Sequence, residues 1–408
     1  MAKFVPPTQT GSLTDHQHGT NDTFVGFTFL HGDAYSMYDD SHGGNDTLIG
    51  ADYSPQNWLY GDAELMDDNS RGGNDTLTGG DYSNRNLLYG DAGYMSGNAI
   101  GGNDTLTGGH YSNVDTLVGD AGQMYGNATG GNDTLIGPGP HFNQLLGDAE
   151  TFMGDDSRGG NDTLTGGDSA NNGLHGDALF MQDNARGGGD TLIGGVGGEN
   201  ALYGDALDLN DNARGGNDTL VGGTGATNTL YGEAQLMSGN TAGGNDTLLG
   251  GAGSNTFNSM RGDGDFMRDD AHGGDDTLIG GDGSFINYFF GDAFEMRDNA
   301  RGGNDTLISG TGTDHMWGDA QFIVGSTVAT GADTFVFAPG NGNDDINDFR
   351  QSDHDRIDVS AYGFTSLVDM MITFDGANTR IDFDATNSVT LVGFADPSAL
   401  HASDFLFS

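Results

Sequence analysis

The chain has 408 residues, of which 74 are Gly and none is Cys, and its formal net charge is −47. With 13 Lys and Arg against 60 Asp and Glu, it has no basic surface for phosphates, so we expect no nucleic-acid partner. The lack of Cys excludes disulfides and thiolate metal sites. No apolar run is long enough to cross a membrane, so we expect no membrane insertion.

Residues 1–20 are interpreted as a polar N-terminal tail without the apolar stretch of a cleavable secretory signal. Only Lys3-Phe4-Val5 has the composition of a short strand, and Pro6 and Pro7 limit the hydrogen bonds that it can make. Two alternatives stay open. The tail is disordered, or it is a donor strand that joins the open end of another copy.

Residues 21–330 are dominated by one repeat with a period of 28–30 residues. Frayed copies at Thr20 (TNDTF) and Ala332 (ADTF) flank the array and bring the total to 12 anchors, or about 11 coils. Copies of GGNDTL or a close variant begin at Gly43, Gly72, Gly101, Gly130, Gly159, Gly187, Gly215, Gly243, Gly273 and Gly302.

A second unit, [N/D]-x-Φ-x-G-D, lies inside each period, as in Asn86–Asp91. The two units predict two short strands per coil with an inward Leu in each, joined by a short turn and a long turn. Four residues after each GD acid, the long turn carries an apolar residue, which predicts a small satellite core or, as the alternative, a Met surface that binds a partner. These residues are Met37, Met66, Met95, Met124, Phe152, Met181, Leu209, Met237, Met267, Met296 and Ile323.

Both units are similar to the nonapeptide GGxGxDxUx of RTX calcium-binding β-rolls, over roughly residues 19–335. The resemblance implies an all-β fold, a right-handed parallel β-roll or β-solenoid of about 11 coils. In that family the turns hold Ca²⁺ between successive coils, and the U residue of each strand fills the core.

Stacked coils place equivalent residues about 4.8 Å apart, so each sequence column becomes a ladder. The short-turn column consists mostly of neutral amides, which can hydrogen-bond along the stack without a metal. Its members are Asn57, Asn86, Asp115, Asn143, Asn172, Asn200, Asn228, Asn258, Asn287 and Asp314.

The long turn instead carries two carboxylates per coil. Like charges at this spacing repel by about 1 to 4 kcal/mol per pair, whereas Ca²⁺ takes 6–8 oxygen ligands. We therefore predict about ten Ca²⁺ ions on the long-turn edge. The opening acids are Asp33, Asp62, Asp91, Asp120, Asp148, Asp177, Asp205, Glu233, Asp263, Asp292 and Asp319. The closing acids are Asp46, Asp75, Asp104, Asp133, Asp162, Asp190, Asp218, Asp246, Asp276 and Asp305.

The outward column of the second strand is too apolar for a solvated face. Either the long turn covers it, or it associates laterally with another copy or a carbohydrate. The column reads His31, Tyr60, Tyr89, Val118, Leu146, His175, Tyr203, Tyr231, Arg261, Phe290 and Trp317.

Residues 331–408 change in composition, and their apolar residues alternate with polar ones, which predicts a strand-rich cap over the end of the solenoid. This segment resembles the C-terminal module of serralysin-type proteases, mannuronan epimerases and other type I secretion substrates. Asp404-Phe405-Leu406-Phe407 is similar to their terminal export signal. The resemblance implies the type I secretion apparatus as a partner, and a secreted protein that folds on Ca²⁺ outside the cell.

No HExxH, GxSxG or GxxxxGK[ST] motif is present, so we predict that the chain is not an enzyme. We expect a calcium-binding structural protein of the cell surface or extracellular matrix that self-associates into layers or fibres. One alternative is an adhesin-like accessory module that binds carbohydrate or a surface. The other is an enzyme with unrecognised chemistry.

Overall fold

The computed structural model describes residues 11–408, and Lys3-Phe4-Val5 lies outside the described residues. Two compact units are present, Met1–Asp190 and Thr191–Ser408. The fold is all-β, a parallel β-solenoid of about 11 coils, which confirms the predicted fold class. The helical elements of the described residues are the short 3-10 segments η1 (Ser360–Tyr362), η2 (Leu367–Asp369), η3 (Pro397–Ala399) and η4 (Ala402–Asp404).

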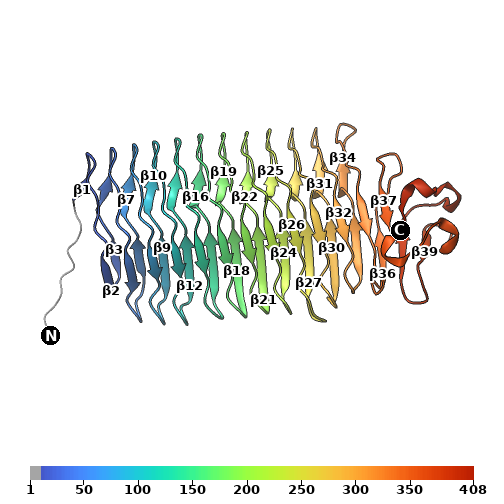
Figure 1. Cartoon of the computed structure of the whole chain (residues 1–408), viewed down its shortest axis with the longest axis horizontal. Coiled ribbons are helices and arrows are strands. Elements are labelled where there is room, and N and C mark those ends of the chain that lie inside the picture. Colours follow the sequence, from blue (N-terminus) through green and yellow to red (C-terminus); the bar gives the residue numbers. More distant parts are fainter. Residues whose placement is uncertain (1–10) are drawn as a thin grey trace. The chain divides into compact units, whose positions relative to one another are not determined.

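Three sheets run through the first unit, each with one strand per coil (Figure 1). The Thr sheet contains β2 (Thr23–Phe27), β5 (Thr47–Gly50), β8 (Thr76–Thr78), β11 (Thr105–Thr107), β14 (Thr134–Ile136) and β17 (Thr163–Thr165). The Asn sheet contains β3 (Phe29–His31), β6 (Asn57–Tyr60), β9 (Arg85–Tyr89), β12 (Val114–Val118), β15 (Phe142–Leu146) and β18 (Ala170–His175). The lobe sheet contains β1 (Ser12–Leu13), β4 (Ser36–Met37), β7 (Ala63–Met66), β10 (Ala92–Met95), β13 (Ala121–Met124), β16 (Ala149–Met153) and β19 (Ala178–Met181).

The second unit has the same three kinds of strand. Its Thr sheet contains β20 (Thr191–Ile193), β23 (Thr219–Val221), β26 (Thr247–Leu249), β29 (Thr277–Ile279), β32 (Thr306–Ile308), β35 (Thr334–Val336), β37 (Arg356–Asp358) and β41 (Phe405–Leu406). Its Asn sheet contains β21 (Gly198–Tyr203), β24 (Thr227–Tyr231), β27 (Phe257–Arg261), β30 (Ile286–Phe290), β33 (Asp314–Trp317), β36 (Asn343–Ile346), β40 (Ser388–Leu391), β39 (Thr379–Asp382) and β38 (Met371–Phe374). Its lobe sheet contains β22 (Ala206–Leu209), β25 (Ala234–Met237), β28 (Gly264–Met267), β31 (Ala293–Arg297) and β34 (Ala320–Val324).

The lobe sheet corrects the prediction of two strands per coil. The long turn, which we call the lobe, runs from each opening acid to the next closing acid, and it begins with a third strand directly after the opening acid. In β10 the buried residues are Ala92 and Met95, three positions apart. This spacing breaks the alternation by which a strand is recognised in a sequence. The four apolar or small residues of β10 therefore read as part of a turn.

The core between the Thr and Asn sheets follows the predicted columns. Leu77 and Leu106 of the Thr sheet and Leu88 and Leu117 of the Asn sheet are fully buried. Strands pair in register, with Leu106 opposite Leu77 and Leu117 opposite Leu88. Each Leu therefore stacks on its equivalent in the next coil.

The amide column stacks as predicted. Asn57 Nδ2 donates a hydrogen bond to Asn86 Oδ1 at 2.7 Å, and Asn86 Nδ2 donates to Asp115 Oδ1 at 2.6 Å. Asn86 also accepts from Gly80 N at 3.0 Å and donates to Gly80 O at 3.2 Å, which closes the short turn. At Asn57 and Asn86 this edge is satisfied by protein groups, whereas Asp115 Oδ2 and Asn143 Oδ1 are buried without a partner among the described residues.

Most of the apolar lobe residues are buried, as Met66, Met95 and Met124 show, whereas Ile323 on the last lobe strand is half-buried. The prediction was wrong at Phe152, which is only half-buried, because the inward residue of that coil is Met153. The pairing of β16 with β13 shifts register between Ala121 and Gln123, and the extra residue of β16 moves the buried position by one.

The apolar outward column of the Asn sheet lies under the lobes. Tyr60, Tyr89, Val118 and Leu146 form a buried cluster, and Leu179 of the lobe strand β19 packs against it. Tyr60 and Tyr89 are thus buried within the chain, as coverage by the long turn predicts. In the second unit the same column is buried at Tyr231, whose hydroxyl donates to Asp265 Oδ2 at 3.1 Å.

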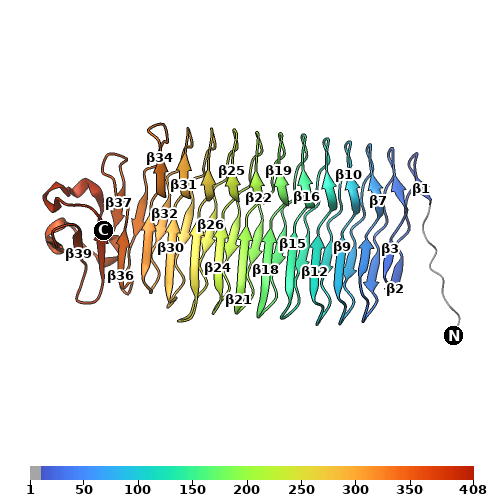
Figure 2. The ribbon, with the colours of Figure 1, turned by 180° about the vertical axis from the view of Figure 1, so that it is seen from behind.

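The C-terminal end of the second unit is rich in strands, as predicted. Strands β38, β39 and β40 pair antiparallel, and β40 continues the Asn sheet by pairing parallel with β36. Figure 2 shows β39 beyond β36 at the C-terminal end of this unit. Strand β41 pairs with β37 at the edge of the Thr sheet. Among residues 11–408, no helix has the length and apolarity needed to cross a membrane.

Truncating one methionine of the lobe core tests the assignment of the third strand. We expect Met124→Ala to lower the free energy of unfolding by about 2–5 kcal/mol, because it leaves a cavity in a fully buried site. The control is Thr105→Ala, an exposed position of the neighbouring Thr sheet, which should change it by at most about 0.5 kcal/mol. Denaturant unfolding checks both. Equal effects would place Met124 in an unpacked turn.

Candidate cation-binding site

The predicted acids come together at the base of each lobe, where the chain leaves the Asn sheet and later enters the Thr sheet. We call them the carboxylate ladder. All 21 acids predicted as ligands are buried, with none more than 3 % exposed. The opening acid ties the base of its own lobe: Gly73 N donates to Asp62 Oδ2 at 2.9 Å, and Gly131 N donates to Asp120 Oδ1 at 2.9 Å. These hydrogen bonds hold the two ends of each lobe together.

The closing acids connect successive coils. Asp75 Oδ1 accepts a hydrogen bond from Asp46 N at 2.6 Å, and Asp104 Oδ1 accepts from Asp75 N at 2.6 Å. In the second unit Asp276 Oδ1 accepts from Asp246 N at 2.7 Å. Each of these carboxylates uses one oxygen to fix the spacing of two coils.

The other oxygen of most of these carboxylates is buried and has no donor among the described residues. Such an oxygen is costly to bury unless a proton or a cation satisfies it. It occurs at Asp46, Asp62, Asp75, Asp104, Asp133, Asp148, Asp162, Glu233, Asp246, Asp263, Asp276, Asp292, Asp305 and Asp333.

Glycines at the lobe base leave room for these oxygens. A Cβ on Gly61 would lie 1.6 Å from the carbonyl oxygen of Gly90 and 2.0 Å from Asp75 Oδ2. The next coil repeats the arrangement, since a Cβ on Gly90 would lie 1.7 Å from Gly119 O and 2.0 Å from Asp104 Oδ2. In both places two hydrogen-bond acceptors converge on one point. Acceptors repel one another, so the arrangement favours a positive charge between them.

The pKa values of these carboxyls reflect the cost of burying their charges close together. Burial raises the pKa of Asp46 to about 7 and that of Asp75 to about 9. Burial also raises the pKa of Asp104 well above its usual range, and the charges of Asp91 and Asp133 raise it further. Without a cation, burial therefore favours the protonated form of these carboxyls.

The available ligand atoms fit a hard cation such as Ca²⁺, because they are carboxylate and carbonyl oxygens alone. In the part of the chain that the structure describes, no three His, Asp or Glu side chains form a ready cluster for a metal. Two carboxylates per coil are present, so backbone carbonyls would have to complete the coordination.

Sequence reasoning missed three acids of this edge: Asp333, Asp348 and Asp355. Asp333 is buried and has an oxygen without a donor, and the frayed ADTF copy at Ala332 contained the signal for it. Asp348 and Asp355 belong to the cap, where no repeat marks them. Their hydrogen bonds to Gly318 N and Asp333 N nevertheless continue the ladder.

No family model matches the sequence, and no curated protein matches it either. Among solved structures, it is similar to the solution structure of the AlgE6R2 subunit from the Azotobacter vinelandii mannuronan C5-epimerase. That chain is 23 % identical, the match covers 46 % of this chain and 92 % of that one, and the TM-score is 0.23. A TM-score this low does not show a shared fold, so the site rests on the geometry described above.

The raised pKa values predict an unusual pH dependence for the calcium-free protein. A carboxyl whose folded pKa lies above its unfolded value stabilises the fold fully below about pH 4, and this contribution is lost as the pH rises through the folded pKa. For Asp46 and Asp75 that loss falls near pH 7 and pH 9. We therefore expect calcium-free protein to melt at a higher temperature at pH 5 than at pH 8.5.

Circular dichroism melts of calcium-free protein check this dependence. With saturating Ca²⁺, the difference between the two pH values should shrink or reverse, because the ion binds the deprotonated carboxylates. A calcium-free protein that is more stable at pH 8.5 would show that these carboxyls are not buried together.

Proposed function

We propose that the chain is a secreted calcium-binding structural protein of the cell surface or extracellular matrix. The observation that carries the proposal is the row of buried carboxylate oxygens that lack donors within residues 11–408 and lie near backbone carbonyls. A group such as Asp75, with the carbonyl of Gly90 beside it, would hold the ion. When bound, Ca²⁺ supplies the positive charge that allows the carboxylates to stay ionised while buried.

Ion binding and folding are linked in this arrangement. The ladder brings together acids 13 positions apart, such as Asp62 and Asp75, and acids of successive coils. The unfolded chain does not hold these groups together, so the free energy of binding contributes directly to folding. Extracellular calcium modules have dissociation constants of about 10⁻⁴–10⁻³ M, so such a chain would fold outside the cell. Export by the type I apparatus follows from the resemblance of residues 331–408.

Self-association is the second part of the proposal. Strand β34 is the last strand of the lobe sheet among the described residues, and Phe322 and Val324 on it are 47 % and 52 % exposed. A sheet edge with exposed apolar side chains readily accepts a strand from another chain. We expect copies to join through this edge.

An adhesin-like accessory module is the second candidate, and one observation favours it. Tyr53, Tyr82 and Tyr111 form an exposed row on the short turns of the first unit, with ring centroids 5.0 and 5.1 Å apart. Each of these tyrosines has a positive φ, which is costly for an aromatic residue. Exposed aromatic side chains are frequent at binding surfaces.

Comparing the two turns of the coil tests the calcium edge. We expect Asp104→Ala to remove about one bound Ca²⁺ per chain, because Asp104 has a buried oxygen without a donor. Asn86→Ala should leave the number of ions unchanged, since its amide bonds only to protein groups. Titration calorimetry measures both. Equal losses of ion would mean that calcium binds elsewhere.

A charge on the lobe edge tests assembly. In Ca²⁺, negative-stain microscopy should show extended assemblies of the full chain, and Val324→Lys should shorten or abolish them. The control is Val368→Lys, which changes another exposed valine, 89 % exposed in η2. If the unchanged chain gives only separate particles in Ca²⁺, the self-association proposal fails and the accessory module is favoured.

A further inference from the structure

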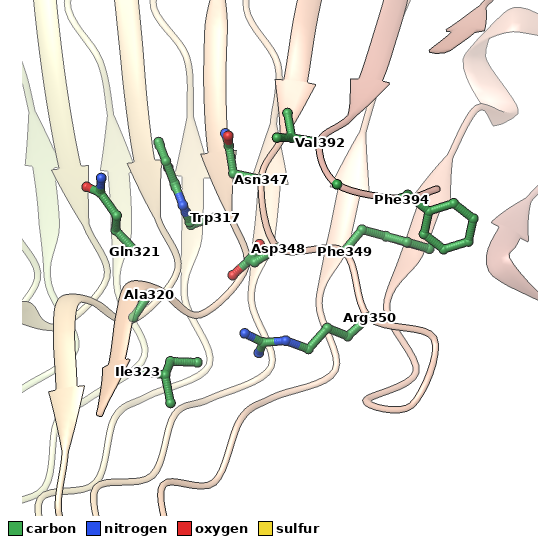
Figure 3. Close-up of a pocket in the computed structure, with 11 residues that line it drawn as sticks. Trp317, Ala320, Gln321, Ile323, Asn347, Asp348, Phe349, Arg350, Val392 and Phe394 are labelled. Carbon is green, nitrogen blue, oxygen red and sulfur yellow. The ribbon is translucent and has the colours of Figure 1, made fainter. Parts of the chain in front are cut away.

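The carboxylate ladder of the second unit ends against the cap, beside a cavity of about 450 Å³. β34 belongs to the lobe that Asp319 opens, and it is the last strand of the lobe sheet among residues 11–408, so no further lobe strand pairs with it there. Instead, the segment after β36 passes the base of this lobe. Figure 3 shows Asp348 and Arg350 of that segment reaching toward Ala320 and Ile323 of the last lobe strand.

The carboxylate of Asp348 accepts the hydrogen bonds that backbone carbonyls of a following coil accept elsewhere in the ladder. In the preceding coil, the N–H groups of Gly291 and Asp292 donate to backbone carbonyls of the following coil at 2.9 and 3.1 Å. In the last coil, Gly318 N donates to Asp348 Oδ1 at 2.8 Å, and Asp319 N donates to Asp348 Oδ2 at 3.2 Å. One carboxylate thus takes the place of two carbonyl groups.

Arg350 satisfies the oxygen that Asp292, the opening acid of the preceding coil, leaves without a donor among the described residues. In Asp292, Oδ1 accepts from Gly303 N at 2.6 Å, and Oδ2 has no donor among the described residues. In Asp319, Oδ1 likewise accepts from Gly331 N at 2.7 Å, but Oδ2 accepts from Arg350 Nη1 at 2.8 Å. The guanidinium donates to the oxygen of Asp319 that is equivalent to the oxygen without a donor in Asp292.

The backbone of Arg350 is fixed by the same ladder. Arg350 N donates to Asp355 Oδ2 at 2.7 Å, and Asp355 Oδ1 accepts from Asp333 N at 3.1 Å. Asp353 Oδ2 lies 3.6 Å from Arg350 Nη1 and helps to orient the side chain. Asp319 is 1 % exposed, so the ion pair with Arg350 is shielded from water on the side of the acid.

We propose that Arg350 is a built-in cation that takes the place of a calcium ion at the last opening acid, so that the array of calcium sites ends before Asp319. This inference rests on the proposed calcium-binding function and departs from the sequence prediction, which included Asp319 among the ligands. Arg suits the position because its guanidinium stays charged at every relevant pH and carries only donors.

Counting ions in matched variants of the full chain tests the inference. We expect Asp292→Asn to bind about one Ca²⁺ fewer than the unchanged chain after equilibrium dialysis. Asp319→Asn should bind the same number as the unchanged chain. If both variants lose an ion, Arg350 does not replace calcium and the inference fails. If Asp292→Asn loses none, the proposed ladder of calcium sites fails first, and the inference with it.

A double-mutant cycle tests the role of Arg350 independently of the ion count. In saturating Ca²⁺, Arg350→Gln should lower the melting midpoint by roughly 2–4 °C or more, because it leaves Asp319 without its partner. In an Asp319→Asn background the same change should have little effect. Arg356→Gln, at an exposed position of β37, is the control for loss of charge. It should not shift the melting midpoint of the unchanged protein or of the Asp319→Asn variant. Equal shifts from Arg350→Gln in both backgrounds would overturn the inference.

Discussion

Repulsion between buried carboxylates is the constraint on which the rest of this structure depends. Each coil buries two acids at the base of its lobe, and one oxygen of most of them has no donor among residues 11–408. A protein cannot bury so many like charges unless protons or cations neutralise them. The GD and GGND glycines serve the same constraint, because a side chain at Gly61 would fill the space between Asp75 Oδ2 and the next carbonyl.

The other ladders carry no such cost. Asn86 passes its hydrogen bonds along the short-turn edge, while Leu88 and Met95 stack in two separate cores. Neutral columns of this kind are satisfied by the protein itself. The coil therefore has one edge built from carboxylates and another built mostly from amides, although both belong to the same repeat.

The repeat made much of this visible in the sequence. The repeat places one equivalent residue in each coil, and a strand has a period of two. These two facts predict the inward Leu residues, the Asn ladder and the acidic edge. The strand of each lobe did not, because Ala92 and Met95 are spaced like neither a strand nor a helix. The sequence predicted Phe152 at the inward position of its lobe, where Met153 lies, because one additional residue in β16 shifts the register. Asp348 and Arg350 belong to no repeat, so only the path of the cap brings them to Asp319.

The lobe tips of the first unit have a consequence for anything attached to them. Each tip is a tight turn with a residue in the left-handed region, such as Asp68, Gly97 or Asp155. Exposed tips of this kind tolerate insertions well, and successive tips repeat about every 4.8 Å along the stack. Neighbouring tips could therefore carry only extended peptides, which would pair with one another and lengthen the sheet. Bulkier inserted domains would need several unaltered coils between them, so the coil repeat sets the spacing at which such domains can be attached.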